Sequence, residues 1–360
     1  GGEILTEIGL HIKTSLEPAT TVTVGYANGL IGYVPGKKTY PLGGYEVASS
    51  YHLFLRPGHE VIRALGGLHR FMGWSGPILT DSGGYQVYSL SNLRKIDNDG
   101  VSFRSHLDGS AAFLSPEKSI DVQLALGSDV LMVLDDCLAF PASRQDAERS
   151  MRRSMDWAER SRRRFDEAGR DTQTVFGIVQ GSVYPDLRAE SVARLVETGF
   201  EGYAIGGLAV GEPVAQMYDT VEQLDPLLPA DRPRYLMGVG TPENLLECVA
   251  RGVDMFDCVM PTRHARNGWL FTREGHIVIR HSKYQSDERP IEGGCLCPVC
   301  EKYSRAYLRH LFISKEILSS VLNTIHNLFF YLDTMRKIRH FIESEGFSDL
   351  LTVTRNARAQ

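Results

Sequence analysis

Short apolar runs alternate with amphipathic stretches through the middle of this chain, and this alternation limits the folds open to it. Seven runs have the composition of buried β-strands, and segments with helical periodicity separate most of them. A strand, a helix and a second strand form a parallel βα unit, because the helix returns the chain across the sheet. The runs cover residues 46–52, 77–81, 129–135, 174–180, 203–210, 234–238 and 255–260, and the helical stretches cover residues 115–126, 142–168, 185–198, 214–224 and 242–251.

This repetition favours a (β/α)8 barrel, the TIM-barrel fold, over the rival doubly wound sheet. Such a barrel needs eight parallel strands and takes about 250 residues. Several of the runs end on polar or glycine-rich residues, and the carboxyl ends of barrel strands meet at one mouth, where active sites lie. These polar strand ends are residues 81–84, 135–137, 180–181 and 206–207, together with Asp257.

Composition narrows the class of protein further. The 360 residues include 39 basic and 44 acidic side chains, a net charge of −5, so the overall field does not attract nucleic acid. No apolar run reaches the roughly 20 residues that span a bilayer, and the amino terminus shows no secretory signal. Three of the six cysteines are clustered, unlike the even spread of a disulfide scaffold. We therefore expect a reduced, cytoplasmic protein in which any RNA site is a local basic patch.

The clustered cysteines predict a structural zinc site. Cys295, Cys297 and Cys300 lie within six residues, and His326 follows after 25 intervening residues. Zinc prefers tetrahedral Cys and His ligands, and a closed Cys₃His set leaves no position for catalysis. His326 lies on the helix expected to pack over the cysteines, whereas His310 is nearer in sequence and remains the competing fourth ligand.

Three aspartates end predicted strands and are candidates for the chemistry. An unpaired carboxylate is costly at a buried strand end, and function is one reason to retain it there. Two carboxylates that face one substrate can act as nucleophile and as proton acceptor in glycosidic-bond chemistry. The competing interpretation is helix capping, or ion pairs with Arg263 and Arg266. The candidates are Asp81, Asp135 and Asp257, and Asp136 and Asp254 are neighbouring alternatives.

Basic residues are concentrated after the last predicted strand and again after the cysteines. Arginine and lysine position a phosphate backbone, and aromatic rings stack on exposed bases. The first group is residues 262–268, and the second is Lys302, Arg305 and Arg309 with Tyr303 and Tyr307 between them. The alternative for either group is an ordinary solvated helix face.

Residues 51–350 resemble the bacterial tRNA-guanine transglycosylases, also called queuine tRNA-ribosyltransferases. The stretches that carry the resemblance are residues 80–86 (TDSGGYQ), 105–109 (SHLDG), 177–182 (GIVQGS), 206–212 (GGLAVGE), 235–240 (YLMGVG), 255–258 (MFDC), 261–263 (PTR), 266–268 (RNG) and the Cys-X-Cys-X₂-Cys cluster. Together these motifs are highly specific. The resemblance implies a TIM barrel with an appended zinc subdomain, a homodimer, and exchange of a guanine in tRNA for a deazaguanine base.

The resemblance also assigns roles to residues of this chain. Asp257 would be the nucleophile that attacks C1′ of nucleotide 34 to give a covalent RNA–enzyme intermediate, and Asp81 would be the general acid/base. The bound base would contact Ser82, Gly83, Gly84, Tyr85, Asp135, Cys137, Gln180, Gly207, Leu208 and Met237. The anticodon loop would contact Gly238, Val239, Gly240, Thr241, Pro242, Glu243, Asn244, Thr262, Arg263, His264, Ala265 and Arg266.

Two positions in the pocket resemble the bacterial form of this family. Cys137 and Val210 match the enzymes that take 7-aminomethyl-7-deazaguanine as the incoming base, and the domain typical of archaeal members is missing from this sequence. The amino terminus departs from the family, because Ser49 stands where an asparagine is expected and the first barrel strand is missing or replaced. A tRNA-binding, zinc-stabilised pseudo-enzyme is therefore the alternative function.

We expect four segments along the chain. Residues 1–47 form an atypical segment, with a hairpin signal around Asn28-Gly29 and a resemblance over residues 21–47 to part of the neutral ceramidases. Residues 48–290 form the barrel. Residues 291–350 form the zinc subdomain, with helices at 302–311 and 315–345, and residues 351–360 are a tail.

Overall fold

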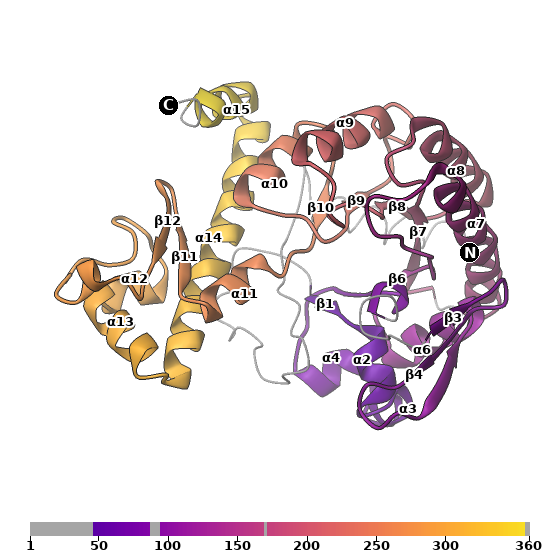
Figure 1. Cartoon of the computed structure of the whole chain (residues 1–360), viewed down its shortest axis with the longest axis horizontal. Coiled ribbons are helices and arrows are strands. Elements are labelled where there is room, and N and C mark those ends of the chain that lie inside the picture. Colours follow the sequence, from indigo (N-terminus) through magenta and orange to yellow (C-terminus); the bar gives the residue numbers. More distant parts are fainter. Residues whose placement is uncertain (1–45, 87–93, 169–170, 357–360) are drawn as a thin grey trace. The chain divides into compact units, whose positions relative to one another are not determined.

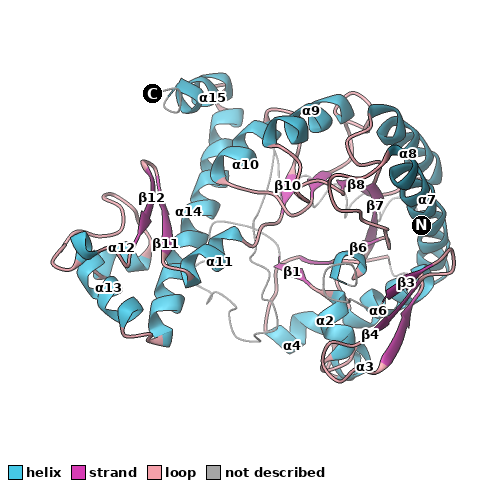
Figure 2. Cartoon of the chain, viewed as in Figure 1, coloured by secondary structure: helices cyan, strands magenta, loops and turns pink. Residues whose placement is uncertain are grey.

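The computed structural model describes residues 46–86, 94–168 and 171–356, and these form two compact units. Among the described residues, the first unit takes in 46–239 and 244–256, and the second takes in 240–243 and 257–356. Figure 1 shows the elements of each unit, and Figure 2 shows their secondary structure. The predicted hairpin, the missing first strand and the ceramidase-like segment all lie outside the described residues.

The first unit is built on a parallel sheet of seven described strands, which confirms the predicted α/β class. Its strand order is β1-β2-β6-β7-β8-β9-β10, and every pair in it is parallel. Most strands are buried along their whole length, as expected when helices cover a parallel sheet. The bounds are β1 (Glu46–Ala48), β2 (Ile78–Thr80), β6 (Val130–Met132), β7 (Thr174–Val179), β8 (Gly202–Ile205), β9 (Arg234–Leu236) and β10 (Met255–Phe256).

Helices follow the strands and line the outside of the curled sheet, in the manner of a TIM barrel (Figure 1). They are α6 (Pro116–Leu126), α7 (Arg144–Ala168), α8 (Pro185–Thr198), α9 (Val214–Leu224) and α10 (Pro242–Val249), close to the predicted spans. Local sequence explains the ends of α6. The Ser115 hydroxyl accepts a hydrogen bond from the Lys118 amide at 3.1 Å, and Gly127 ends the helix in the left-handed conformation at φ 71°.

The segment around β1 and β2 contains elements that the sequence did not predict. Short helices α2 (Ser50–Leu55), α3 (His59–Ala64) and α4 (Gly67–Met72) join β1 to β2. An antiparallel meander of β3 (Arg94–Ile96), β4 (Val101–Arg104) and β5 (Ala111–Leu114) precedes α6. The predicted strand over residues 46–52 was therefore too long, because its last three residues begin α2.

The second unit is organised around one long helix, α14 (Ile317–Glu343). Its other elements are α11 (Met260–Arg266), the hairpin β11 (Trp269–Thr272) and β12 (Gly275–Val278), the 3₁₀ turn η2 (Ser282–Tyr284), α12 (Pro298–Lys302), α13 (Arg305–Ile313) and α15 (Phe347–Asn356). α11, α12, α13 and β11 all contact α14. The two helices predicted after the cysteines correspond to α13 and α14. None of the helices in the described part of the chain has the length and apolar character needed to cross a membrane.

Candidate active site and metal centre

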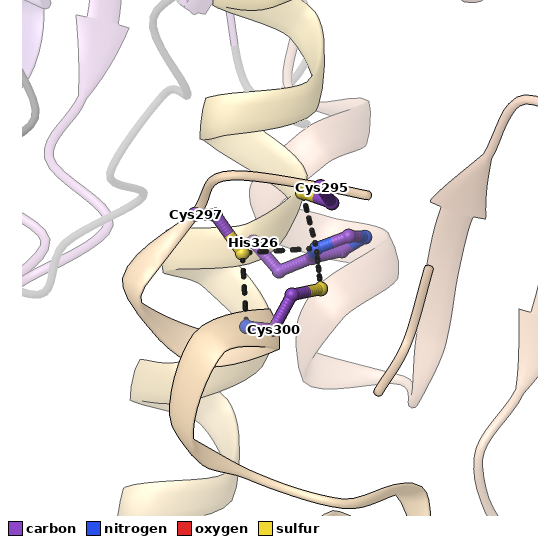
Figure 3. Close-up of side chains that lie close together, drawn as sticks. All are labelled: Cys295, Cys297, Cys300 and His326. Atoms are coloured by element: carbon purple, nitrogen blue, oxygen red, sulfur yellow. Dashed lines mark hydrogen bonds between the residues drawn. The ribbon is translucent and has the colours of Figure 1, made fainter. Parts of the chain in front are cut away.

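The three cysteines and His326 converge in the second unit (Figure 3). Nδ1 of His326 lies 3.4 Å from Sγ of both Cys297 and Cys300, and 4.0 Å from Sγ of Cys295. A tetrahedral zinc ion with ordinary ligand distances places sulfur and nitrogen about 3.5 Å apart. The four donors therefore fit a metal ion of this kind. They are the only such group among the described residues, and the competing His310 is exposed on α13.

Local structure orients each of these donors. Cys297 is the N-cap of α12, where its sulfur accepts a hydrogen bond from the Cys300 amide at 3.2 Å. Hydrogen bonds with Cys297 and Cys300 hold the pKa of the Cys295 thiol well below its usual range, which favours a thiolate ligand. Nε2 of the buried His326 lies 2.8 Å from the Phe271 carbonyl on β11. That carbonyl accepts the Nε2 proton and leaves Nδ1 for the metal, the usual outer contact of a histidine ligand.

Asp81 follows β2 in the first unit and is held by several donors. Its Oδ1 accepts hydrogen bonds from the Ser50 amide at 2.9 Å, the Ser50 hydroxyl at 3.1 Å and the Gly83 amide at 3.1 Å. Its Oδ2 accepts one from the Gln86 side chain at 2.8 Å. The carboxylate is 7% exposed, so it has a fixed orientation at the carboxyl end of the sheet.

The carboxyl ends of β6 and β7 bring Asp135 and Gln180 together. Nε2 of Gln180 donates to one Asp135 oxygen at 2.7 Å, and the Ser82 hydroxyl donates to the other at 3.4 Å. Burial raises the pKa of Asp135 to about 6, and the nearby Asp136 carboxylate adds to this, while the hydrogen bonds from Gln180 and Ser82 oppose it. The structure thus joins three predicted base-contacting residues in one buried array.

Two predicted glycines line the same array and leave room in it. A Cβ on Gly207, whose φ is 64°, would lie 2.5 Å from Oε1 of Gln180. A Cβ on Gly84 would lie 2.7 Å from the Asp135 carbonyl oxygen and 3.1 Å from its Oδ1. A side chain at either position would displace the polar groups of the array, which explains why glycine stands there.

Cys137 and Arg188 complete the surroundings of this array. Cys137 is buried, and burial followed by the charges of Asp135 and Asp136 raises the pKa of its thiol. The Arg188 guanidinium on α8 donates to the carbonyls of Ser182 at 2.7 Å and Val179 at 3.0 Å, which fixes the turn after Gln180. Sequence reasoning missed Arg188, and it also missed Ser50 and Gln86 as partners of Asp81. Gln86 lies inside the TDSGGYQ motif, and that motif could have indicated it as a site residue.

The alternative aspartates have other partners. Asp136 forms an ion pair with Arg153 at 2.6 Å. Asp254 accepts a hydrogen bond from the Arg234 amide at 2.9 Å, at the start of β9.

Asp257 follows β10 and is 6% exposed. It belongs to the second unit, whereas Asp81 belongs to the first.

The predicted RNA contacts after Asp257 fall on α11. Arg263 and Arg266 are exposed and His264 is half-buried, whereas Thr262 and Ala265 face the interior of the unit. The Ala265 carbonyl accepts a hydrogen bond from Asn323 of α14 at 3.3 Å. α11 therefore presents two exposed arginines on a helix that is fixed to α14, the helix that carries His326.

The remaining predicted contacts surround the start of α10. Gly238 and Val239 follow β9, and the Gly240 carbonyl accepts a hydrogen bond from the Tyr331 hydroxyl of α14 at 3.2 Å. Asn244 donates to the Tyr218 hydroxyl at 2.7 Å. In the basic group after the cysteines, Lys302 is exposed, but Arg305 forms an ion pair with Asp287 at 3.2 Å. Arg305 is thus engaged within its own unit.

The first unit is thus a curled parallel α/β sheet with buried carboxylates at its carboxyl edge, and the second carries a Cys₃His cluster that could hold a metal ion. Together they define a barrel-type α/β protein with a candidate metal site. Comparison with known proteins narrows this class. The family model described as queuine tRNA-ribosyltransferase matches residues 44–360, and the chain belongs to that family. The resemblance found over residues 51–350 is confirmed.

Bacterial proteins named queuine tRNA-ribosyltransferase are similar over most of this chain. The protein of Thermodesulfovibrio yellowstonii is 52% identical over 309 residues, which cover 85% of this chain and 80% of that protein. The protein of Koribacter versatilis is 53% identical over 304 residues, with 82% and 79% covered. The protein of a Shewanella species is 52% identical over 332 residues, with 92% and 88% covered.

Proposed function

We propose that this chain is a tRNA-guanine transglycosylase that exchanges guanine at position 34 of tRNA for 7-aminomethyl-7-deazaguanine. The observation that carries the proposal is the buried array of Ser82, Asp135 and Gln180 at the carboxyl edge of the sheet. A guanine edge offers N–H donors beside a carbonyl acceptor, and a carboxylate next to an amide complements that edge. Family membership over residues 44–360 supports this assignment.

In this proposal the base lies against Asp135, with Gln180 and the backbone of Gly207 and Leu208 at its carbonyl side. Tyr85 and Met237 stack on its two faces. The Asp135 carboxylate accepts hydrogen bonds from the base, so it acts in its ionised form, and its pKa of about 6 makes that form available at neutral pH. Cys137 and Val210 line the pocket where the bacterial enzymes accept the aminomethyl group.

The proposed chemistry consists of two displacements at C1′ of nucleotide 34. A carboxylate oxygen of Asp257 forms a bond to C1′ as the bond from C1′ to guanine N9 breaks, and guanine leaves with the electron pair and takes up a proton from water. The incoming base then attacks C1′ through N9, loses its N9 proton to Asp81 and releases Asp257. Two inversions retain the configuration of the ribose.

The remaining parts of the protein would serve RNA binding and stability. Arg263 and Arg266 would hold phosphates of the anticodon loop, with the target nucleotide extruded from the loop. The ion in the Cys₃His site would be Zn²⁺, which has four protein ligands there and fixes the fold of the second unit. We further propose, from family membership, that the active form is a homodimer.

A guanine-exchange assay tests the proposed function. Radiolabelled guanine should enter a tRNA with G34 and should not enter the same tRNA with A34, and unlabelled 7-aminomethyl-7-deazaguanine should displace the label. Asp257→Asn and Asp81→Asn should each prevent turnover, whereas Asp231→Asn, on a side chain that is 81% exposed, should not. Tight tRNA binding without any exchange would instead support the pseudo-enzyme interpretation.

A further inference from the structure

Three rings form a cluster beside α11, the helix of the second unit that carries Arg263 and Arg266. The rings of Trp269 and His276 lie face to face, with centroids 3.9 Å apart and planes 9° apart. His264 of α11 packs edge-on against Trp269 at 5.2 Å. Trp269 is 36% exposed and His276 is also exposed, so the stack reaches the surface. We call His264, Trp269 and His276 the aromatic platform.

The hairpin register places these rings on one face. Phe271 lies opposite His276, and Trp269 lies opposite Val278. Residues two apart on a strand share a face, so Trp269, Phe271 and His276 project to the same side. The turn from α11 into β11 requires glycine at position 268, where φ is 75° and a Cβ would lie 2.8 Å from the Phe312 ring.

Buried contacts hold the platform rigid. The His264 ring stacks on the Phe271 ring with centroids 5.5 Å apart and planes 8° apart. Phe271 is 8% exposed, its amide donates to Asn327 at 3.1 Å, and its carbonyl faces Nε2 of His326. Phe271 therefore fixes the platform to α14, and its carbonyl also orients His326. A rigid platform loses little conformational entropy when a ligand binds.

The charges around the platform are mainly positive. Arg263 and Arg266 are exposed on the two sides of His264, and neither forms an ion pair with a carboxylate among the described residues. Arg273 follows β11; its side chain is 56% exposed and lies 3.9 Å from the Glu292 carboxylate, so it is paired and adds less positive charge than the two arginines of α11. Burial lowers the pKa of His264, and the charges of Arg263 and His276 lower it further. Flat rings beside unpaired guanidinium groups are the combination that binds unpaired nucleotides.

We propose that the aromatic platform stacks an unpaired nucleobase of the anticodon loop other than the target guanine, while Arg263 and Arg266 bind phosphates of the same loop. This inference rests on the proposed function and adds a second base-binding position to it. A protein partner is the less favoured occupant, because the exposed arginines beside the rings match a polyanion. Stacking accepts any base, so the platform would contribute affinity without sequence preference.

An RNA-binding experiment separates stacking from charge. The probe is an anticodon stem-loop with G34 and 2-aminopurine at a neighbouring loop position, whose fluorescence falls when the base stacks. Trp269→Ala should weaken binding about 5- to 100-fold and abolish the quenching, and Trp269→Phe should restore most of both. The dependence of affinity on salt should be unchanged in Trp269→Ala, because stacking displaces no counterions. Arg266→Ala should reduce the slope of log affinity against log salt concentration by about 0.7 to 0.9.

Controls keep this test decisive. Phe71→Ala removes an aromatic ring of similar exposure from the first unit and should bind the stem-loop normally. Each variant should match the wild-type protein in circular dichroism and zinc content. If Trp269→Ala misfolds, His276→Ala removes the partner ring and should still weaken binding and quenching.

Several outcomes would overturn the proposal. Unchanged affinity and quenching in Trp269→Ala, with guanine exchange intact in the wild-type protein, would remove the platform and leave the proposed function standing. Altered self-association in sedimentation, with stem-loop affinity unchanged, would reassign the platform to a protein contact. A wild-type protein that neither binds the stem-loop nor exchanges guanine would remove both proposals.

Discussion

Replacing Asp135 with asparagine should stabilise the first unit at neutral pH and at the same time impair base binding. Burial raises the pKa of Asp135 from 3.8 to about 6, which means that the folded protein disfavours the charged form. A shift of this size corresponds to about 3 kcal/mol of lost stability once the carboxylate is ionised. Asparagine can accept from Gln180 and donate to Ser82, so the variant keeps this array without the buried charge.

Because the pKa of Asp135 is raised in the folded protein, the stability gained by the variant depends on pH. Below about pH 4 the Asp135 carboxyl is protonated in both the folded and the unfolded chain, so the ionisation of Asp135 adds little to the difference in unfolding free energy between wild type and variant. Between about pH 4 and pH 6 the unfolded chain ionises first, and the wild-type protein loses stability that the variant keeps. Above about pH 6 the difference should level off near 3 kcal/mol in favour of the variant.

Urea unfolding at a series of pH values measures this difference. In a Trp269→Phe background the fluorescence comes from Trp74 and Trp157, both in the unit that contains Asp135. Asp231→Asn in the same background is the matched control and should show no pH-dependent gain. A variant no more stable than wild type at pH 8, or a gain that persists unchanged at pH 4, would refute the role of burial. Affinity for guanine should fall roughly 10- to 100-fold, because an amide cannot replace a carboxylate acceptor.

Three further changes test other parts of the structure. Metal analysis should find one equivalent of zinc in the wild-type protein and none in Cys297→Ser, and the second unit of this variant should melt at a markedly lower temperature; full zinc retention would contradict the assignment. Gly207→Ala should weaken base binding at least about tenfold in isothermal titration, because the new Cβ meets the Gln180 side chain. It should also lower the free energy of unfolding in urea by about 1–2 kcal/mol, because residue 207 has a left-handed φ. Reversing the charges of Arg266 and Lys302 should flatten the salt dependence of tRNA affinity, and an unchanged slope would mark a solvated surface.

Clustered or repeated features were the most predictable from the sequence. The four residues of the candidate metal site could be predicted because three of them lie within six residues, and the packing of α14 over α12 then favours His326 over His310. The parallel sheet followed from the alternation of apolar and amphipathic segments. The polar strand ends predicted one site, and the structure does join Ser82, Asp135 and Gln180 there.

Contacts between distant residues were the part that the sequence could not supply. The amide of Ser50 at the start of α2 is capped by the Asp81 carboxylate, 31 residues away, so a helix begins where the local pattern predicted a strand. A short apolar run does not distinguish helix from strand by itself. Arg305 was grouped with RNA-binding residues, but it pairs with Asp287, whose position relative to α13 is set by the tertiary fold.

Trapping the proposed covalent RNA–enzyme intermediate separates the roles of Asp257 and Asp81. The protein is mixed with tRNA and a guanine analogue that fills the base pocket but cannot attack C1′, and the products are separated on a denaturing gel. The wild-type protein should give a slower band that contains both RNA and protein, and Asp81→Asn should still form some of it, because in the proposed mechanism Asp257 alone forms the bond to C1′. Asp257→Asn should give no such band. A stable adduct with Asp257→Asn and none with Asp81→Asn would show that the two aspartates have the opposite roles.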